Sequence, residues 1–114
     1  MITRLHAAII YVSDIERAKE FYVNKLGWEI VDDQGKYVSL RIGNGSHVAL
    51  NAEGKSFQEP GKQTISVVSN DIDEDYQKVS SLGVRIGDKL ETYTWGRYFS
   101  ILDEDGNHID VVQK

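Results

Sequence analysis

The fold predicted for this sequence follows from residues 14–22, Asp14-Ile15-Glu16-Arg17-Ala18-Lys19-Glu20-Phe21-Tyr22, which Leu26-Gly27 closes. The apolar side chains of this stretch recur at helical spacing and share one face: Ile15, Ala18, Phe21, Tyr22 and Leu26. Asp14 suits the N-cap, because its carboxylate can accept the free amides of the first turn. Gly27 suits the left-handed position that ends a helix. The stretch therefore predicts a helix over 15–26.

A second copy of this pattern begins 57 residues later, at Asp71-Ile72, and closes at Leu82-Gly83. Its apolar residues again lie on one helical face: Ile72, Tyr76, Val79 and Leu82. Asp71 suits the N-cap, and Asp71 with Glu74 has the spacing of a capping box. The second copy predicts a helix over 72–82, and the two copies together predict an internal repeat.

Each predicted helix is preceded by one apolar, β-branched segment and followed by three. The expected strands are 5–12, 28–32, 37–42 and 47–51 in the first copy, and 64–69, 84–89, 98–102 and 108–112 in the second. Asn44-Gly45 predicts a type I′ hairpin turn, and Asp105-Gly106 predicts another hairpin. We therefore expect an α+β fold of two tandem βαβββ modules, forming a curved mixed sheet around a cleft. The modules are about 1–53 and 64–114, joined by a polar linker of about 54–63 into a single domain.

Composition excludes several classes of function. The chain has 114 residues and no Cys, so disulfides, thiolate catalysis and cysteine zinc sites are ruled out. Thirteen basic residues against 18 acidic ones argue against a nucleic-acid partner, and the whole excess of −5 falls in residues 58–114. The longest apolar run, 7–12, is too short to cross a bilayer, and no leader opens the chain. We expect a cytoplasmic protein with no membrane partner.

The repeated modules, the motif of residues 14–22 and the sequence Asp103-Glu104-Asp105-Gly106-Asn107 resemble the vicinal oxygen chelate superfamily. This superfamily contains glyoxalase I, extradiol dioxygenases, fosfomycin-modifying enzymes and bleomycin-resistance proteins. The resemblance covers nearly the whole chain, from about residue 5 to 113, although Glu104 stands where the family usually has Pro. Because this scaffold carries several chemistries and also plain binding, the resemblance implies a fold and not one activity.

In the enzymes of this superfamily, each module supplies one metal ligand from its first strand and one from its last. Carried onto this sequence, those four positions are Ala7, Ala49, Thr64 and Asp110. Since only Asp110 is a good ligand, we expect a protein without a metal cofactor. The alternative is a nonstandard divalent metal site that combines Asp110 with His6, His47 or His108. His6 is offset by one residue from Ala7, so strand alternation predicts a partly buried, hydrogen-bonded His on the opposite face.

The remaining candidates are ligand contacts in the cleft. Aromatic residues gather before the last hairpin, at Tyr93, Trp95, Tyr98 and Phe99, and small residues at the lost metal positions would leave room beside them. The predicted contacts are Tyr11, His47, Asn51, Thr64, Trp95, His108 and Asp110. No catalytic residue is assigned.

The predicted function is metal-independent sequestration of an aromatic or amphipathic small molecule, similar to the bleomycin-resistance proteins. The acidic surface would attract a cationic ligand. We expect a homodimer, because the family often forms one. One alternative is a metal-dependent lyase, isomerase or dioxygenase that uses the nonstandard His/Asp site. The other is a dimeric domain whose partner is a protein.

Overall fold

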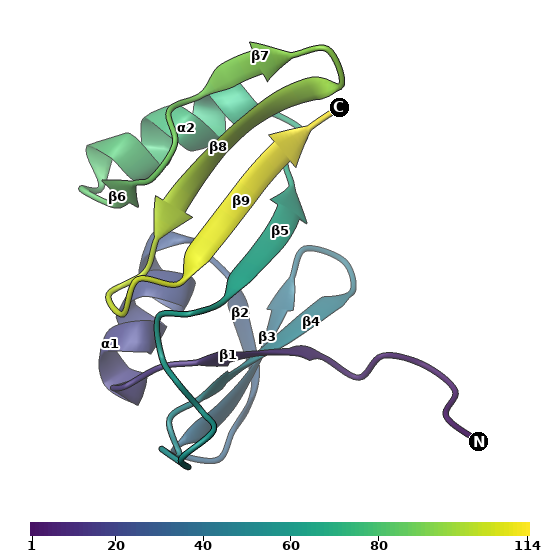
Figure 1. Cartoon of the computed structure of the whole chain (residues 1–114), viewed down its shortest axis with the longest axis vertical. Helices are drawn as coiled ribbons and strands as arrows, with labels where there is room; N and C mark the ends of the chain where they lie inside the picture. Colours follow the sequence, from purple (N-terminus) through teal and green to yellow (C-terminus); the bar gives the residue numbers. More distant parts are fainter. The chain divides into compact units, whose positions relative to one another are not determined.

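The chain divides into two units, Met1–Pro60 and Gly61–Lys114, whose boundary lies in the polar segment 53–63. The structure is a computed structural model and describes all residues, 1–114. Each unit contains its own sheet, with one covering helical segment (Figure 1). The α+β class predicted from the sequence is confirmed, and the strands are hydrogen-bonded as two mixed sheets. The first unit has the predicted βαβββ order, and the second has one additional strand after its helix.

The first unit has strand order β1-β4-β3-β2, with β1 parallel to β4 and the other pairs antiparallel. Its elements are β1 (Ala8–Tyr11), α1 (Ile15–Lys19), the π-helical segment η1 (Glu20–Lys25), β2 (Glu29–Asp33), β3 (Tyr37–Ile42) and β4 (Ser46–Asn51). β1 is shorter than the predicted strand 5–12, and Leu5 is exposed. The segment that carries His6 therefore lies outside the ladder.

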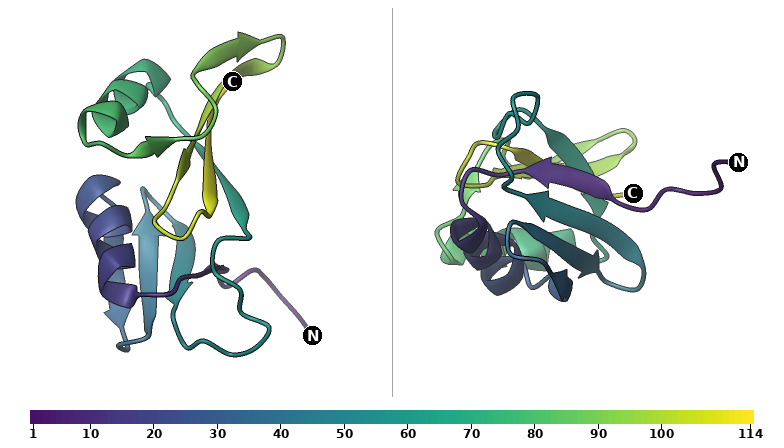
Figure 2. Two further views of the ribbon diagram at one scale, coloured as in Figure 1. Left: turned by 60° about the vertical axis from the view of Figure 1, so that its left-hand side comes forward. Right: turned by 90° about the horizontal axis from the view of Figure 1, so that it is seen from below.

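The helix predicted over 15–26 begins as an α-helix and continues as η1. The Asp14 carboxylate accepts the Glu16 and Arg17 amides at 3.0 and 3.2 Å, so the predicted N-cap is confirmed. The predicted apolar face is buried most deeply at Ala18, Phe21 and Tyr22, and the Tyr22 ring lies 5.2 Å from that of Trp28. The helical segment that carries these side chains lies against one face of the sheet (Figure 2).

The second unit has strand order β5-β9-β8-β6, and β7 pairs with β8 outside this path. Its elements are β5 (Thr64–Val68), α2 (Ile72–Ser81), β6 (Arg85–Ile86), β7 (Glu91–Tyr93), β8 (Gly96–Leu102) and β9 (His108–Gln113). The strand expected over 84–89 is correct only for β6, because the chain then turns at Gly87-Asp88. The sequence analysis did not predict β7.

Asp71 caps α2 by accepting the Glu74 amide at 3.2 Å, but the reciprocal half of a capping box is absent. The Asp71 amide donates instead to the Ser69 hydroxyl, at 3.0 Å. Leu82, predicted on the buried face, is 42% exposed because it is the C-cap residue, beyond the last full turn. Ile72 and Val79 are buried as predicted.

The hairpin predicted between 37–42 and 47–51 is present, but its turn is not type I′. That turn needs a positive φ at both Asn44 and Gly45, whereas the positive φ, +56°, belongs to Gly43. Ile42 pairs with Ser46, which leaves a three-residue turn. The second predicted hairpin joins β8 to β9, where Leu102 pairs with His108. None of the helices is long and apolar enough to span a membrane.

Candidate functional site

The sheet of the second unit has one face packed on α2 and one face that its own helix leaves uncovered. The buried face carries Ile65, Val67, Phe99, Ile101, Ile109 and Val111, and the Phe99 ring meets Tyr76 of α2 at 5.0 Å. Because side chains alternate along a strand, the residues between them lie on the opposite face, here named the open face. It carries Thr64, Ser66, Tyr98, Ser100, His108 and Asp110.

Three of the predicted contacts are neighbours on this open face. Thr64 pairs with His108 across β5 and β9, and Asp110 is two residues further along β9. Asp110 is flanked by Ser66 on one side and Ser100 on the other. Register alone therefore brings a hydroxyl, an imidazole and a carboxylate together.

A second carboxylate, that of Asp88, reaches the same face from the loop between β6 and β7. Ser100 holds this loop with both its backbone and its side chain: the Gly87 amide donates to Ser100 O at 2.8 Å, and the Asp88 amide donates to Ser100 Oγ at 2.8 Å. A Cβ on Gly87 would lie 2.6 Å from Ser100 Oγ, so a larger residue would displace the loop. Ser100 is fully buried and thus a fixed support.

Tyr98 connects the two carboxylates. Its hydroxyl donates to Asp88 Oδ2 at 2.5 Å. Burial raises the pKa of Tyr98 to about 12, with further contributions from the hydrogen bond to Asp88 and the charge of Asp110. Burial also raises the pKa of the Asp110 carboxyl; His108 opposes this rise, and the negative charge of Asp88 adds to it. The open face therefore holds two acids and a phenol that affect one another's protonation.

Trp95, the fourth predicted contact in this unit, belongs to an aromatic cluster that adjoins these acids. It lies in the turn between β7 and β8 (Figure 1), and its ring stacks on Tyr93 with centroids 5.7 Å apart and planes 2° from parallel. The Tyr98 ring lies 6.5 Å from Trp95 and 6.3 Å from Tyr93. Trp95 is 49% exposed, so much of its ring surface is open to a ligand.

The other predicted contacts form a separate group in the first unit. Tyr11 and Asn51 are direct partners across β1 and β4, and His47 lies on the same face of β4 as Asn51. The Asn51 amide already has partners, since Nδ2 donates to Glu53 Oε1 at 3.0 Å and Oδ1 accepts the Glu53 amide at 2.9 Å. Asn51 thus ends β4, and its side chain is buried and already hydrogen-bonded.

His6 does not follow the sequence prediction. It is exposed and lies before β1, so strand alternation does not apply to it. His6 and its neighbour Ala7 both line a hollow of about 400 Å³ that also includes His47. The expectation of a partly buried His on the far face is therefore wrong.

The residues at the metal positions implied by the superfamily do not fit a metal. Ala7 and Ala49 have no donor atom, and Thr64 offers only a hydroxyl, which leaves Asp110 alone. The alternative donors are divided between the units: His6 and His47 line the hollow of the first, whereas His108 accompanies Asp110 in the second. Neither unit contains three or more His, Asp or Glu side chains grouped to hold a metal ion.

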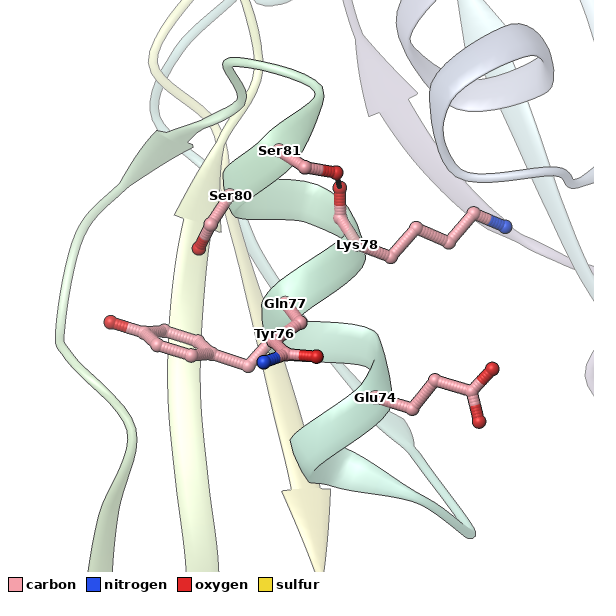
Figure 3. Close-up of a pocket in the computed structure, with 6 residues that line it drawn as sticks. All are labelled: Glu74, Tyr76, Gln77, Lys78, Ser80 and Ser81. Carbon is pink, nitrogen blue, oxygen red and sulfur yellow. Dashed lines mark hydrogen bonds between the residues drawn. The ribbon is translucent and has the colours of Figure 1, made fainter.

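A second hollow lies along α2 and contains none of the predicted contacts. Glu74, Tyr76, Gln77, Lys78, Ser80 and Ser81 line it (Figure 3). Ser81 Oγ donates to the Lys78 carbonyl at 2.8 Å, a bond internal to the helix. Its charged residues are one acid and one base, Glu74 and Lys78, and Tyr76 is its single aromatic residue, unlike the paired acids and clustered rings of the open face.

Sequence reasoning missed Asp88, Ser100 and the polar role of Tyr98. Tyr98 and Ser100 were detectable, because pairing the predicted strands 98–102 and 108–112 around Asp105-Gly106 puts both on the face of Asp110. Asp88 gave no such signal, since its place depends on hydrogen bonds to a residue 12 positions away.

Comparison with known proteins agrees with this architecture. Residues 4–111 match the family model described as the Glyoxalase/Bleomycin resistance protein/Dioxygenase superfamily. A member of that superfamily from Sphaerobacter thermophilus DSM 20745 has a solved structure with TM-score 0.83 and 33% identity, covering 99% of this chain and 98% of its own. TnmS3, an antibiotic binding protein from Streptomyces sp. CB03234, has TM-score 0.88 and 28% identity, covering 98% and 96%.

The protein YetH of Bacillus subtilis (strain 168) is 29% identical over 94% of this chain and 95% of its own length. The family match spans both βαβββ units and reaches the strand that carries Asp110. By fold, by motif and by this match, the chain belongs to the Glyoxalase/Bleomycin resistance protein/Dioxygenase superfamily.

Proposed function

We propose that the protein binds an aromatic or amphipathic small molecule at the open face of its second unit, without a metal ion. The observation that carries the proposal is the aromatic cluster of Tyr93, Trp95 and Tyr98 beside the carboxylates of Asp88 and Asp110. Flat aromatic rings offer a large contact area to a planar ligand at low cost in side-chain entropy. The adjoining acids favour a ligand that also carries positive charge.

The polar groups of the open face would orient such a ligand. Asp110 accepts hydrogen bonds or pairs with a cation, and the neighbouring pair of His108 and Thr64 offers a donor and a hydroxyl. Asp88 and Tyr98 are already bonded to each other, so their geometry is set before the ligand arrives. This preorganisation supports binding, because less side-chain freedom is lost on association.

Two further facts support binding rather than metal chemistry. Three of the four metal positions lack imidazole and carboxylate groups. TnmS3, similar in structure over nearly the whole chain, is itself an antibiotic binding protein. We propose a homodimeric state from the habit of the family, and light scattering on the purified protein tests that point separately.

A pair of fluorescent probes of opposite charge tests the binding proposal. We expect ethidium, a planar cation, to bind with saturation and to quench tryptophan emission. The anion 8-anilinonaphthalene-1-sulfonate should bind the aromatic cluster at least tenfold more weakly, measured as the part of its binding that Trp95→Ala removes. The Trp95→Ala variant should lose at least tenfold in ethidium affinity, about 1.4 kcal/mol. Phe57→Ala is the matched control, since Phe57 is an exposed aromatic residue outside the cluster. Equal effects of the two substitutions would contradict the site.

Metal independence needs its own measurement. Ethidium binding should be the same before and after exhaustive chelation, and elemental analysis of the purified protein should give no stoichiometric divalent metal. If binding or any turnover requires added metal, and Asp110→Ala removes both, then the alternative of a nonstandard metal-dependent enzyme is correct instead.

A further inference from the structure

The hollow of about 400 Å³ in the first unit is chemically unlike the open face of the second. Its lining comes from the segment before β1, the bulged strand β2, and strands β3 and β4. Ala7, Val31 and Val48 are apolar, and the polar lining is Arg4, His6, Asp32, Ser39 and His47. The volume falls in the range of about 300–1,000 Å³ that small-molecule pockets occupy.

The three basic side chains of this hollow have no partner within the chain. The side chains of Arg4, His6 and His47 take part in no hydrogen bond and no ion pair. The other arginines are all engaged: Arg41 with Glu29, Arg97 with Asp73, Arg85 with the Asp103 carbonyl, and Arg17 in a further interaction. Arg4 is thus the one arginine whose guanidinium is left free, and it lines a hollow with two free imidazoles.

One carboxylate, that of Asp32, also lines the hollow. Both of its oxygens accept from Gln34 Nε2, at 3.2 and 3.0 Å, and its ladder partner is Ser39. It forms no ion pair with Arg4 or either His. Asp32 therefore lowers the positive potential of the hollow without occupying its donors.

We propose that this hollow binds a small organic anion, a carboxylate or phosphate group carried on an apolar body. The guanidinium of Arg4 can donate two parallel hydrogen bonds to such a group, and His6, His47 and the Ser39 hydroxyl add donors around it. Ala7, Val31 and Val48 provide contact area for the apolar body. The residues that line this hollow all belong to the first unit, and the proposal does not rest on the function proposed for the second.

Four small probes test the site by isothermal titration or by chemical shifts in NMR spectra. Benzoate and phenyl phosphate carry the anion on a ring, inorganic phosphate carries the anion alone, and benzylamine carries a cation on the same ring. We expect at least one of the two aromatic anions to shift the NMR signals of the residues that line the hollow, with saturation, and benzylamine to leave those signals unchanged. Benzoate binding more tightly than phenyl phosphate, or the reverse, identifies the head group. Inorganic phosphate binding as tightly as the aromatic anions would overturn the proposal, as would saturation by none of them.

Substitutions then assign the contacts. Arg4→Gln, and separately the His6→Gln/His47→Gln double variant, should each weaken the aromatic anion at least tenfold. Asp32→Asn should tighten it severalfold, a gain that loss of structure would not produce. Arg97→Gln is the matched control: it removes the same charge from the second unit and should leave the affinity unchanged. Unchanged affinity in Arg4→Gln would overturn the proposal, and so would Zn²⁺ binding that depends on both His residues while no anion binds.

Discussion

Asp103 and Asn107 hold each other across the β8–β9 turn. Asp103 Oδ1 accepts the Asn107 backbone N–H at 2.8 Å, and Asp103 Oδ2 accepts from Asn107 Nδ2 at 2.9 Å. The two residues are only 2% and 1% exposed. Asn107 Oδ1 in turn accepts the amides of Gly61 and Gln63, at 3.0 and 3.1 Å. The motif near the end of the chain therefore fastens the segment before β5 to the turn that positions β9.

Asn107→Ala should be strongly destabilising, because it leaves two backbone amides without their acceptor and removes a donor from a buried carboxylate. Such losses amount to about 2–4 kcal/mol in total. Urea unfolding followed by circular dichroism measures the change. Asn107→Asp is the informative companion, since it keeps an acceptor for the two amides but puts a second carboxylate against Asp103. Its stability should fall at neutral pH and recover in acid; a variant equally stable at both pH values would contradict the geometry.

Asp110→Asn should make the protein more stable at neutral pH. Burial raises the pKa of Asp110, so the fold favours the protonated carboxyl and disfavours the charged one. The free-energy cost of the charged Asp110 carboxylate is absent in acid, below the ordinary carboxyl pKa. It grows as the pH rises through the raised pKa of the folded protein. The gain should be on the order of 0.5–1 kcal/mol at neutral pH and vanish in acid. Melting temperatures of both proteins between about pH 3 and 7 measure it.

Asp73→Asn is the control for the Asp110→Asn experiment, because it should change stability at neutral pH in the opposite direction. The hydrogen bonds from Arg97 lower the pKa of Asp73, so its charged form stabilises the fold above the ordinary carboxyl pKa. This variant should be less stable than the wild type at neutral pH and equal to it in acid. If both substitutions shift the melting temperature in the same direction, Asp110 does not have the environment described.

Tyr98 should ionise only in strongly alkaline solution. Burial, then the hydrogen bond to Asp88, raises its pKa to about 12. Because the fold favours the neutral phenol, Tyr98 contributes its full stabilisation below about pH 10, the ordinary pKa of a tyrosine. That stabilisation is lost as the pH rises through the raised pKa of the folded protein. Absorbance of the phenolate during alkaline titration measures the step, which should be missing in Tyr98→Phe. Asp88→Asn should move it to lower pH, and an unchanged titration would show that Asp88 does not hold the hydroxyl.

The features of this protein that the sequence could predict depend on residues close together in the chain, or on the alternation of side chains between the two faces of a strand. Asp14 and Asp71 were identified as caps because a cap bonds amides two or three residues away. Thr64, His108 and Asp110 lie on one face because a strand repeats every second residue and the β9 register follows from its turn. Each of these features can be predicted from a short segment of the sequence, without knowledge of distant contacts.

The parts that sequence missed depend on distant contacts. Asp88 is held by Ser100, and β7 exists only because β8 continues far enough to pair with it. His6 was assigned to a strand, but the ladder with β4 begins at Ala8. The reciprocal bond of the capping box was assigned to Glu74, and the Ser69 hydroxyl takes it instead. Asp88 and β7 thus depend on tertiary partners, whereas a different local partner replaced the expected one at the cap of α2.

The β3–β4 turn offers a direct test of one such difference, because the predicted and observed turns make opposite demands on two glycines. In the structure Gly43 has φ +56°, a left-handed conformation that costs a residue with a Cβ about 1–2 kcal/mol. Gly45 has no positive φ, and a Cβ there would meet nothing within 4 Å. A type I′ turn at Asn44-Gly45 would instead need a positive φ at Gly45, so an alanine would be strained at position 45.

Gly43→Ala should therefore lower the free energy of unfolding by about 1–2 kcal/mol. Gly45→Ala should leave it unchanged or raise it by about 0.4–1 kcal/mol, since alanine restricts the unfolded chain more than glycine does. The two variants differ from the wild type by the same single methyl group, two residues apart, so hydrophobicity and size cannot account for a difference between them. Urea unfolding of both proteins measures it. If Gly45→Ala proves the more damaging substitution, the turn is the type I′ hairpin that Asn44-Gly45 suggests, and the register of Ile42 with Ser46 would have to change with it.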